Sequence, residues 1–359
     1  MQKDKSLFFP YWEENEIDIT LKKISKIYNS IVDEYSKQLF ENRLMLSITD
    51  SPYYARRIIE SIKPGINLST EIINRKRVWI YGCGMRGQRI ASMFPETKIL
   101  GFLDREKKGE YQKIPIVRPQ EATFQKNDLI LISNLKGANS ISNYLQTTFK
   151  ISKKQILTLN SFDKRMQNKI YFDKRCISRF NPTSGVFIDA GAFDGKDSIN
   201  FMKSPLFRNN KIIIFESDSY NCRNIEKKLT KRKNIIIFNK GLSDTKTKIP
   251  FISERGVSSH FSNHGNCFME TATLDEICKN ENVGYIKMDI EGYEKKALMG
   301  ARNVIKRDNP NMMISLYHKK NDIIDIPTLL LDFNSKYKFA LGHYKTGSIT
   351  DTVLYAFVK

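Results

Sequence analysis

Short apolar runs alternate with longer polar stretches in two parts of the chain. In residues 75–160 such runs occupy 77–81, 98–103 and 128–133. In residues 185–359 five runs follow one another, and polar side chains follow each run. Apolar runs of four to six residues that are separated by helix-length segments are typical of buried strands in a parallel sheet. The pattern therefore predicts an α/β fold with two Rossmann-like domains.

A different pattern covers residues 17–62, where apolar side chains such as Leu21, Ile24 and Ile27 recur every three or four positions. This spacing predicts amphipathic helix, broken at 50–52 and ended by Pro64–Gly65. We expect this segment to serve packing or association between copies of the chain. The expected domains are a helical N-terminal segment (1–74), a small Rossmann-like domain (75–160), a connector (161–184) and a larger α/β domain (185–359).

The strand ends of the larger domain share a chemical character. In an open parallel sheet, ligands bind beyond the carboxyl ends of the strands. Four acidic residues and one histidine follow the five expected strands. They are Asp189, Glu216, Asp244, Asp289 and His318. The sequence therefore predicts a binding site along this edge.

The first turn of the larger domain favours a particular ligand. Gly191 and Gly195 form a G-x-x-x-G turn, and Glu216 at the next strand end is placed to accept hydrogen bonds from ribose hydroxyls. Asp189 before the first glycine would repel a diphosphate, so a cationic, phosphate-free nucleoside such as S-adenosylmethionine fits. The alternative is an ordinary turn with incidental acids. The expected cofactor-binding residues are Asp189, Gly191, Ala192, Phe193, Glu216, Ser217, Ser243, Asp244 and Asp289.

Five parallel strands followed by an antiparallel pair near 337–343 and 353–358 form the layout of a class I methyltransferase. Residues 180–359 also resemble the FkbM family of S-adenosylmethionine-dependent O-methyltransferases. The motifs that carry the resemblance are Phe187–Ala192 with Asp194–Gly195, Ile214–Asp218, Thr273–Glu276, Ile286–Glu294, Leu298–Ala301, Tyr317–His318 and Thr352–Tyr355.

The resemblance implies methylation of a hydroxyl group, often on sugars of polysaccharides, glycolipids or secondary metabolites. A sugar, nucleotide sugar or glycan precursor is the expected acceptor, and the family does not fix which one. The segment 253–264 lies where substrate loops often lie. Its histidines, His260 and His264, are expected to touch substrate or nothing.

Methyl transfer to an alcohol needs help in removing the hydroxyl proton, because an alcohol is a poor nucleophile. Asp289, Glu291 and His318 are the catalytic candidates. In one hypothesis they bind Mg²⁺ or another divalent ion, which acidifies the hydroxyl. In the other, His318 acts directly as the base, since its unperturbed pKa of roughly 6.5 suits that task. The competing interpretations are a helix-terminal charge for Glu291 and a structural role for His318; His343 is a secondary candidate.

The smaller domain contains a second glycine motif. Gly82, Gly84 and Gly87 form G-x-G-x-x-G between an expected strand and helix, and Asp104 follows the second strand at the distance typical of a ribose-binding acid. The unit is short, so a nucleotide or nucleotide sugar is more plausible than NAD. It resembles the nucleotide-sugar-binding modules of bacterial glycan enzymes. A scaffold that binds nothing is the alternative.

Composition adds limits on partners and location. The net charge is +20, but the lysines are scattered and rarely form blocks, so no specific nucleic-acid binding is expected. The five cysteines contain no C-x-x-C pair, which indicates neither a zinc site nor a disulfide framework. The N-terminus lacks the pattern of a signal peptide, and no apolar run approaches about 20 residues. A cytoplasmic protein without a transmembrane segment is therefore expected.

Three other functions fit the sequence less well. A base-flipping amino methyltransferase needs an Asn/Asp-Pro-Pro-aromatic turn after the fourth strand, where this chain has Asp289–Gly292. An NAD(P)-dependent oxidoreductase or epimerase of the smaller domain lacks a following Tyr-x-x-x-Lys. A non-catalytic binding protein would not need the acids and the histidine at the strand ends.

Overall fold

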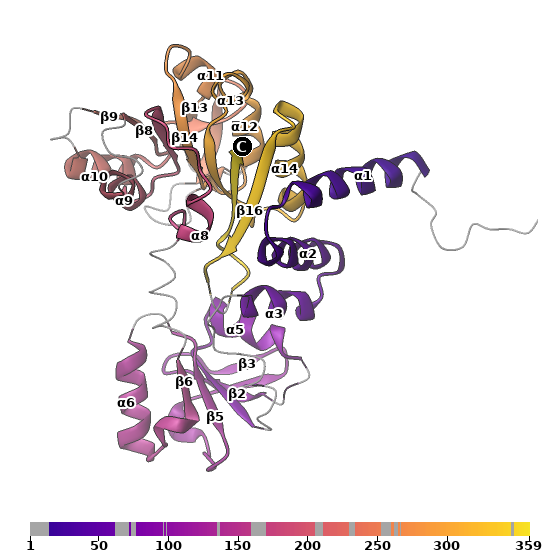
Figure 1. Ribbon diagram of the computed structural model, residues 1–359. Coiled ribbons are helices and arrows are strands. Elements are labelled where there is room, and N and C mark those ends of the chain that lie inside the picture. Colours follow the sequence, from indigo (N-terminus) through magenta and orange to yellow (C-terminus); the bar gives the residue numbers. More distant parts are fainter. Residues whose placement is uncertain are drawn as a thin grey trace, which may run out of the picture. The chain divides into compact units, whose positions relative to one another are not determined.

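The structure is a computed structural model (Figure 1). It describes residues 14–61, 72, 77–95, 97, 99–134, 137–158, 170–204, 211–229, 234–252, 260–261, 265, 267–345 and 348–359. The chain divides into two compact units. Unit 1 consists of Met1–Lys37, Arg179–Ala340 and Leu354–Lys359, and unit 2 consists of Gln38–Ser178 and Leu341–Val353. This division differs from the expected ranges, because the start of the helical segment groups with the larger α/β domain.

Unit 1 is built on a seven-stranded sheet in the order β16-β17-β15-β14-β7-β8-β9. The pairs β14–β15, β14–β7, β7–β8 and β8–β9 are parallel. This order confirms the expected class I methyltransferase sheet, in which the last strand lies between the fifth and the sixth. The strands are β7 (Val186–Ala190), β8 (Ile212–Phe215), β9 (Ile235–Phe238), β14 (Val283–Met288), β15 (Asn311–Ser315), β16 (Tyr337–His343) and β17 (Thr352–Val358).

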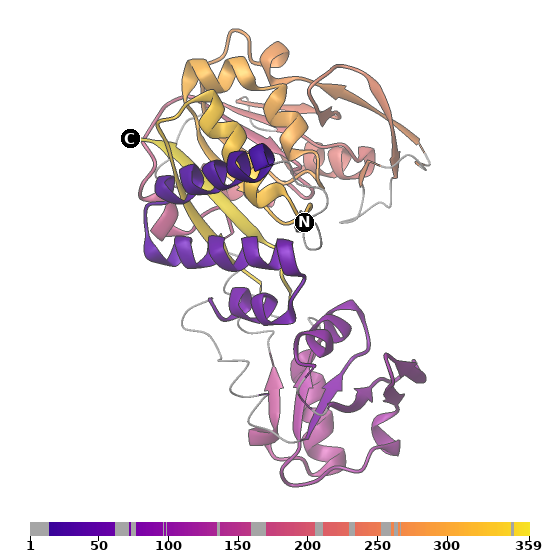
Figure 2. The same cartoon turned by 90° about the vertical axis from the view of Figure 1, so that its right-hand side faces the viewer.

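The chain reverses its direction across this sheet between β7 and β14. From β7 it moves outward through β8 to β9, and from β14 it moves the other way to β15. Right-handed crossovers then place the first group of helices on one face and the second group on the other (Figures 1 and 2). The carboxyl ends of β7 and β14 form the switch point at which open α/β sheets bind ligands. The helices are α9 (Lys196–Lys203) and α10 (Ser219–Leu229) in the first group, and α12 (Glu294–Met299), α13 (Arg302–Asp308) and α14 (Asp322–Phe333) in the second.

A second sheet in unit 1 was not expected from the sequence. It has the order β10-β13-β11-β12 and lies in the chain between β9 and β14, followed by the short helix α11 (Leu274–Ile277). Its strands are β10 (Gly241–Leu242), β11 (Lys248–Ile252), β12 (His260–Phe261) and β13 (Cys267–Ala272). Apart from the two residues of β12, the expected substrate loop at 253–264, including His264, lies outside the described residues.

The N-terminal helices differ in one respect from the predicted pattern. One helix was expected up to residue 49, but α1 (Glu14–Ser30) and α2 (Glu34–Thr49) are separate. Ile31 instead forms a parallel bridge with Phe339, and the N–H of Val32 donates to the Phe339 carbonyl. The Asp33 carboxylate accepts the N–H of Ser36 at 2.9 Å and so caps the start of α2. The expected break near Pro52 is present before α3 (Pro52–Glu60), while Pro64–Gly65 lies outside the described residues.

Unit 2 contains a six-stranded sheet in the order β3-β4-β2-β1-β5-β6. All pairs except β3–β4 are parallel, and apolar clusters cover both faces of the sheet. The α/β organisation expected for 75–160 is therefore present. The elements are β1 (Val78–Tyr81), α5 (Met85–Met93), β2 (Ile99–Leu103), β3 (Gly109–Tyr111), β4 (Ile114–Val117), β5 (Leu129–Ile132), α6 (Ala138–Phe149), β6 (Ile156–Thr158) and, in the connector, α8 (Lys174–Ile177).

Among the described helices of both units, none combines the length and the apolar character that crossing a membrane requires.

Candidate functional site

The candidate site begins where β7 ends and the chain turns toward α9. Gly191 has a φ of +76°, and a Cβ atom on it would lie 1.9 Å from the carbonyl oxygen of Asp289. Only glycine satisfies both conditions without displacing the neighbouring backbone. The N–H of Gly191 donates to the carbonyl of Phe215 at 2.9 Å. The turn is therefore held against the ends of β8 and β14, at the switch point of the sheet.

Glu216 directly follows β8, and the backbone holds its carboxylate in place. Oε2 accepts the N–H of Phe193 at 2.7 Å, and Oε1 accepts the N–H of Asp218 at 2.8 Å. Burial raises the pKa of Glu216, although both hydrogen bonds act in the opposite direction. A carboxylate offers about four acceptor positions. Two of them thus stay available for the hydroxyls of a ribose.

The third strand of the main sheet ends at a residue that sequence reasoning missed. The side-chain amide of Asn239 donates to the carbonyls of Glu216 and Ser217, at 2.8 and 3.2 Å. The chain then leaves this sheet, so Ser243 and Asp244 follow β10 of the second sheet. The expectation that Asp244 ends a strand of the main sheet is wrong. The Ser243 hydroxyl donates to the Asp244 carboxylate at 2.9 Å, and a cofactor-binding role for the two residues stays a prediction.

Asp189, another of the expected cofactor residues, lies in the interior of the sheet. Its side chain is fully buried within the protein. Oδ2 accepts the hydroxyl of Ser198 at 2.6 Å, and Oδ1 lies 3.1 Å from the Nζ atom of Lys287. Both carboxylate oxygens therefore face protein partners, and a direct contact of Asp189 with the cofactor stays a prediction. Of the residues that follow it, Ala192 is buried and Phe193 is 41% exposed.

The chain bends sharply after β14, at the segment that carries two of the catalytic candidates. Glu291 and Gly292 have φ values of +54° and +92°. A left-handed conformation is uncommon for a side chain such as glutamate and occurs most often at functional sites. The bend is closed by the N–H of Ile290, which donates to Glu294 at 2.9 Å. The hydroxyl of Tyr317 holds Asp289 by donating to Oδ1 at 3.0 Å.

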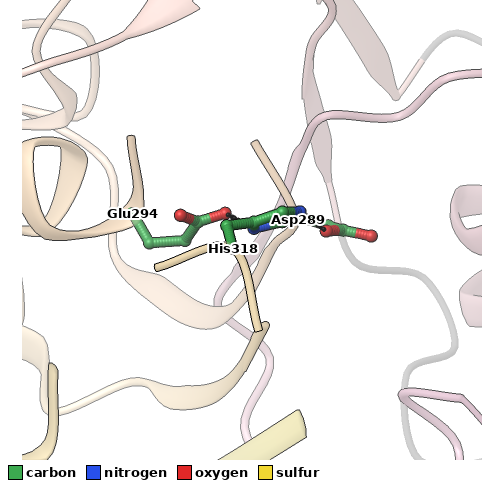
Figure 3. Close-up of side chains that lie close together, drawn as sticks. All are labelled: Asp289, Glu294 and His318. Atoms are coloured by element: carbon green, nitrogen blue, oxygen red, sulfur yellow. Dashed lines mark ion pairs between the residues drawn. The ribbon is translucent and has the colours of Figure 1, made fainter. Parts of the chain in front are cut away.

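His318 lies between carboxylates on both sides of its ring (Figure 3). Nδ1 forms an ion pair with the fully buried Glu294 at 2.8 Å, and Nε2 lies 3.5 Å from both Asp289 and Glu291. The structure thus brings the three catalytic candidates together. Glu294 and Tyr317 belong to the recognised motifs, but sequence reasoning gave them no role.

The charge of His318 differs from the expectation. Burial opposes a positive charge on the ring, but the contact with Glu294 and the charges of Asp289 and Glu291 raise the pKa of His318 to about 9. The imidazole is therefore a cation at neutral pH in the ligand-free chain. The neighbouring Asp322 has a pKa raised to about 6, mainly by burial. The unperturbed value near 6.5 that motivated a direct base is wrong for this environment.

The same residues have the donor set of a divalent-metal site. One ligand atom each of Asp289, Glu294 and His318 lie within 4.8 Å of one another. With Nδ1 directed at Glu294, the free Nε2 atom faces Asp289 and Glu291. A carboxylate that orients a metal-binding histidine from behind is a common arrangement around protein-bound metals. The described residues whose ligand atoms come close together are thus Asp289, Glu294 and His318, and a metal ion at Asp289, Glu291 and His318 stays a prediction.

His343, the secondary candidate, is bonded inside its own hairpin. Its Nδ1 and Nε2 atoms lie 3.0 Å from the Thr352 hydroxyl and 2.9 Å from the Lys345 carbonyl. Burial lowers the pKa of His343 to about 3. A neutral ring with both nitrogens occupied indicates a structural role.

In unit 2 the three glycines of the G-x-G-x-x-G motif have distinct surroundings. A Cβ atom on Gly82, which has a φ of +95°, would lie 2.4 Å from the Asn134 side chain, and one on Gly87 would lie 2.1 Å from the Gly82 carbonyl. At Gly84, which caps α5, nothing lies within 4 Å of that position. Gly82 thus fits a tight turn, Gly87 allows close packing of the helix, and the space beside Gly84 is open.

Asp104 lies beside this turn, and backbone N–H groups hold its carboxylate in place. It accepts the N–H groups of Cys83, Glu106 and Lys107 at 2.9 to 3.1 Å. Partial burial opposes ionisation, but these three hydrogen bonds together with Lys107 lower the pKa of Asp104. The structure therefore brings Gly82, Gly84 and Asp104 together, as the motif predicts.

Sheet order and strand-end chemistry together define unit 1 as a class I methyltransferase fold. Comparison with family models agrees with this assignment. Residues 189–339 match the methyltransferase FkbM domain, and residues 74–157 match a model described as C2185-like, N-terminal. Over these residues, unit 1 is similar to methyltransferase domains of the FkbM type. A search of curated protein sequences finds no significant match.

Comparison with solved structures gives several matches of low sequence identity. Methyltransferase FkbM from Methylobacillus flagellatus is 16% identical, with 90% of this chain and 99% of that chain covered and a TM-score of 0.49. Fibrillarin from Aeropyrum pernix, solved with natively bound S-adenosyl-L-methionine, is 12% identical, with 50% and 69% covered and a TM-score of 0.31. Precorrin-6y C5,15-methyltransferase from Geobacter metallireducens is 12% identical, with 57% and 92% covered and a TM-score of 0.32.

Proposed function

We propose that unit 1 transfers a methyl group from S-adenosylmethionine to a hydroxyl of a sugar, nucleotide sugar or glycan precursor. The observation that carries this proposal is that the expected cofactor residues and the catalytic candidates lie at the same switch point of the sheet. The Gly191 turn and Glu216 would hold the cofactor. The cluster of Asp289, Glu291 and His318 begins at the end of the adjacent strand, where the Asp289 carbonyl touches that turn.

The bound cofactor would supply an electrophilic methyl group on a sulfonium. Glu216 accepts hydrogen bonds from the ribose, and the backbone beside Gly191 passes along the methionine part. Because the acceptor oxygen must lose its proton as the new bond forms, a group near Asp289 has to take that proton. His318 does so at Nε2 when its ring is neutral, with Glu294 holding Nδ1. If a divalent ion occupies the cluster, Asp289, Glu291 and His318 hold it and it acidifies the hydroxyl.

A direct test is mass spectrometry of ligands that stay bound through purification, followed by calorimetry of the emptied protein. We expect adenosylmethionine or adenosylhomocysteine to be released on denaturation, and both to rebind. Sugar and nucleotide-sugar acceptors are then screened with isotopically labelled cofactor for transfer of label to a hydroxyl. A folded protein that neither retains nor binds either compound would refute the proposal.

The environment of the motif in unit 2 favours a second, separate function. We infer that Gly82, Gly84, Gly87 and Asp104 bind a nucleotide or nucleotide sugar. The open space at Gly84 and the fixed, ionised carboxylate of Asp104 support this inference. A helix that begins at such a turn directs backbone N–H groups toward a phosphate.

A thermal-shift screen with UDP-, GDP-, CDP- and ADP-linked sugars and with NAD(H) tests this inference. At least one sugar nucleotide is expected to raise the melting temperature, and Asp104→Ala is expected to abolish that rise. A rise with NAD(H) alone would favour an oxidoreductase. A clear shift with adenosylmethionine and none with any of the others would leave unit 2 as a scaffold.

A further inference from the structure

Lys287 is a buried cation in the middle of an apolar strand. Every residue of β14 is buried, and the Lys287 side chain is 3% exposed. A buried ammonium needs close partners, because removing a charge from water is strongly unfavourable. Sequence reasoning quoted this lysine inside a motif without giving it a role. The signal was available, since a lysine inside an otherwise apolar strand of a parallel sheet is rare.

Several of its close partners lie at the end of β7, in the turn that follows it and at the start of α9. Nζ lies 3.1 Å from Asp189, its register partner on β7, and 3.7 Å from Asp197 in the first turn of α9. It also donates to the carbonyl of Gly191 at 2.6 Å. One ammonium group thus contacts the strand before the turn, the turn itself and the helix after it.

These contacts connect the cofactor turn to the catalytic strand. Lys287 is two residues before Asp289 on the same chain segment. Its bond to Gly191 acts on the peptide that has the left-handed conformation. A buried ion pair is weak support for a purely stabilising role, because apolar side chains of similar volume often stabilise a protein as well or better. A role in selecting one conformation of the turn explains why Asp189, Gly191 and Asp197 all contact this one ammonium group.

We propose that Lys287 is a positioning residue that fixes the Gly191 turn in the conformation that receives the cofactor. This inference rests on the proposed methyltransferase function. Removing the ammonium frees the Gly191 carbonyl and leaves Asp189 and Asp197 without their cation. The turn then samples other conformations, and the cofactor binds only the fraction that is competent.

The test compares three variants in calorimetry and steady-state kinetics. Lys287→Met removes the charge and keeps a similar chain length. The double variant Asp189→Asn/Lys287→Met also removes the buried carboxylate charge, while an asparagine oxygen can still accept the Ser198 hydroxyl. Lys295→Met is the control, because Lys295 is half exposed on α12 and pairs only with Asp325 among the described residues.

Lys287→Met is expected to lower the melting temperature and to weaken adenosylmethionine binding at least tenfold. The double variant is expected to regain most of the lost melting temperature, because only Asp197, whose side chain is 27% exposed, is left without its cation, and to keep the weakened binding. Its KM for the cofactor should rise while kcat at saturation stays within a few-fold of the wild type. Lys295→Met should match the wild type in every measurement.

A folded double variant with wild-type cofactor affinity would show that Lys287 only stabilises the fold and would overturn the inference. That result is distinct from failure of the proposed function. In the latter case the wild-type protein itself would not bind adenosylmethionine.

Discussion

Replacing His318 by alanine is expected to lower turnover by roughly 10²–10⁴-fold, the range typical for loss of a general base. Nε2 of His318 can lose its proton, and it lies 3.5 Å from the carboxylates of Asp289 and Glu291. Glu294 holds the ring at Nδ1. The His318 ring contacts these three carboxylates, whereas Glu216 is held by the N–H groups of Phe193 and Asp218, so cofactor affinity should stay near the wild-type value. Turnover with a methylated acceptor and calorimetry with adenosylmethionine, measured on the same preparation, check both statements.

The pH dependence separates the two ways in which His318 could act. Its pKa is raised to about 9, so the neutral ring is the minor form at pH 7. If His318 itself takes the proton, turnover should rise with pH and level off near pH 9. The stability that the cation contributes follows the opposite course. It is fully present below the unfolded-state pKa of roughly 6.5 and is lost as the pH rises through about 9.

A chelator provides the other discriminating measurement. Loss of turnover that Mg²⁺ or Mn²⁺ restores would assign Asp289, Glu291 and His318 as metal ligands, and the rise toward pH 9 should then be absent. Turnover that is insensitive to chelator and rises with pH would leave His318 as the base. A folded His318→Ala protein that methylates its acceptor at the wild-type rate would contradict both mechanisms.

The parts of the fold that the sequence predicted are those with strong local periodicity. The strands of the main sheet are four to seven residues long and, except for the edge strand β9, almost wholly buried, so their apolar runs are unambiguous. The second sheet was missed because β10 and β12 are only two residues long, and β10 pairs with β13, which lies far from it in the sequence. The break between α1 and α2 was missed for the same reason, since the bridge of Ile31 to Phe339 spans most of the chain.

The candidate site shows a similar limit. Sequence position predicted that Asp289, Glu291 and His318 lie at adjacent strand ends, and the structure brings them together. The position of a residue along its own strand does not show which side chain of the neighbouring strand lies beside it. Asp189 looked like a ligand because it ends a strand, but Lys287 faces it in the register of the neighbouring strand. Likewise, the pKa of His318 depends on Glu294, which is far from it in sequence.

Glu216→Ala is expected to weaken adenosylmethionine binding at least tenfold. Each ribose hydroxyl that donates to the carboxylate contributes about 1.5–3 kcal/mol as a hydrogen bond to a charged group. Alanine also leaves the N–H groups of Phe193 and Asp218 without their acceptor, so the turn that follows Gly191 loosens. Both effects act on the cofactor, and neither reaches the cluster around His318.

Two further variants separate these effects in calorimetry. Glu216→Gln keeps one acceptor oxygen in place, so its affinity should lie between those of the wild type and of Glu216→Ala. Glu226→Ala removes an exposed carboxylate of α10 and should bind like the wild type. For all three proteins, kcat at saturating cofactor should fall much less than it does in His318→Ala. Wild-type affinity in a folded Glu216→Ala protein would mean that the cofactor is held elsewhere, because no ligand that donates two hydrogen bonds to this carboxylate could tolerate its removal.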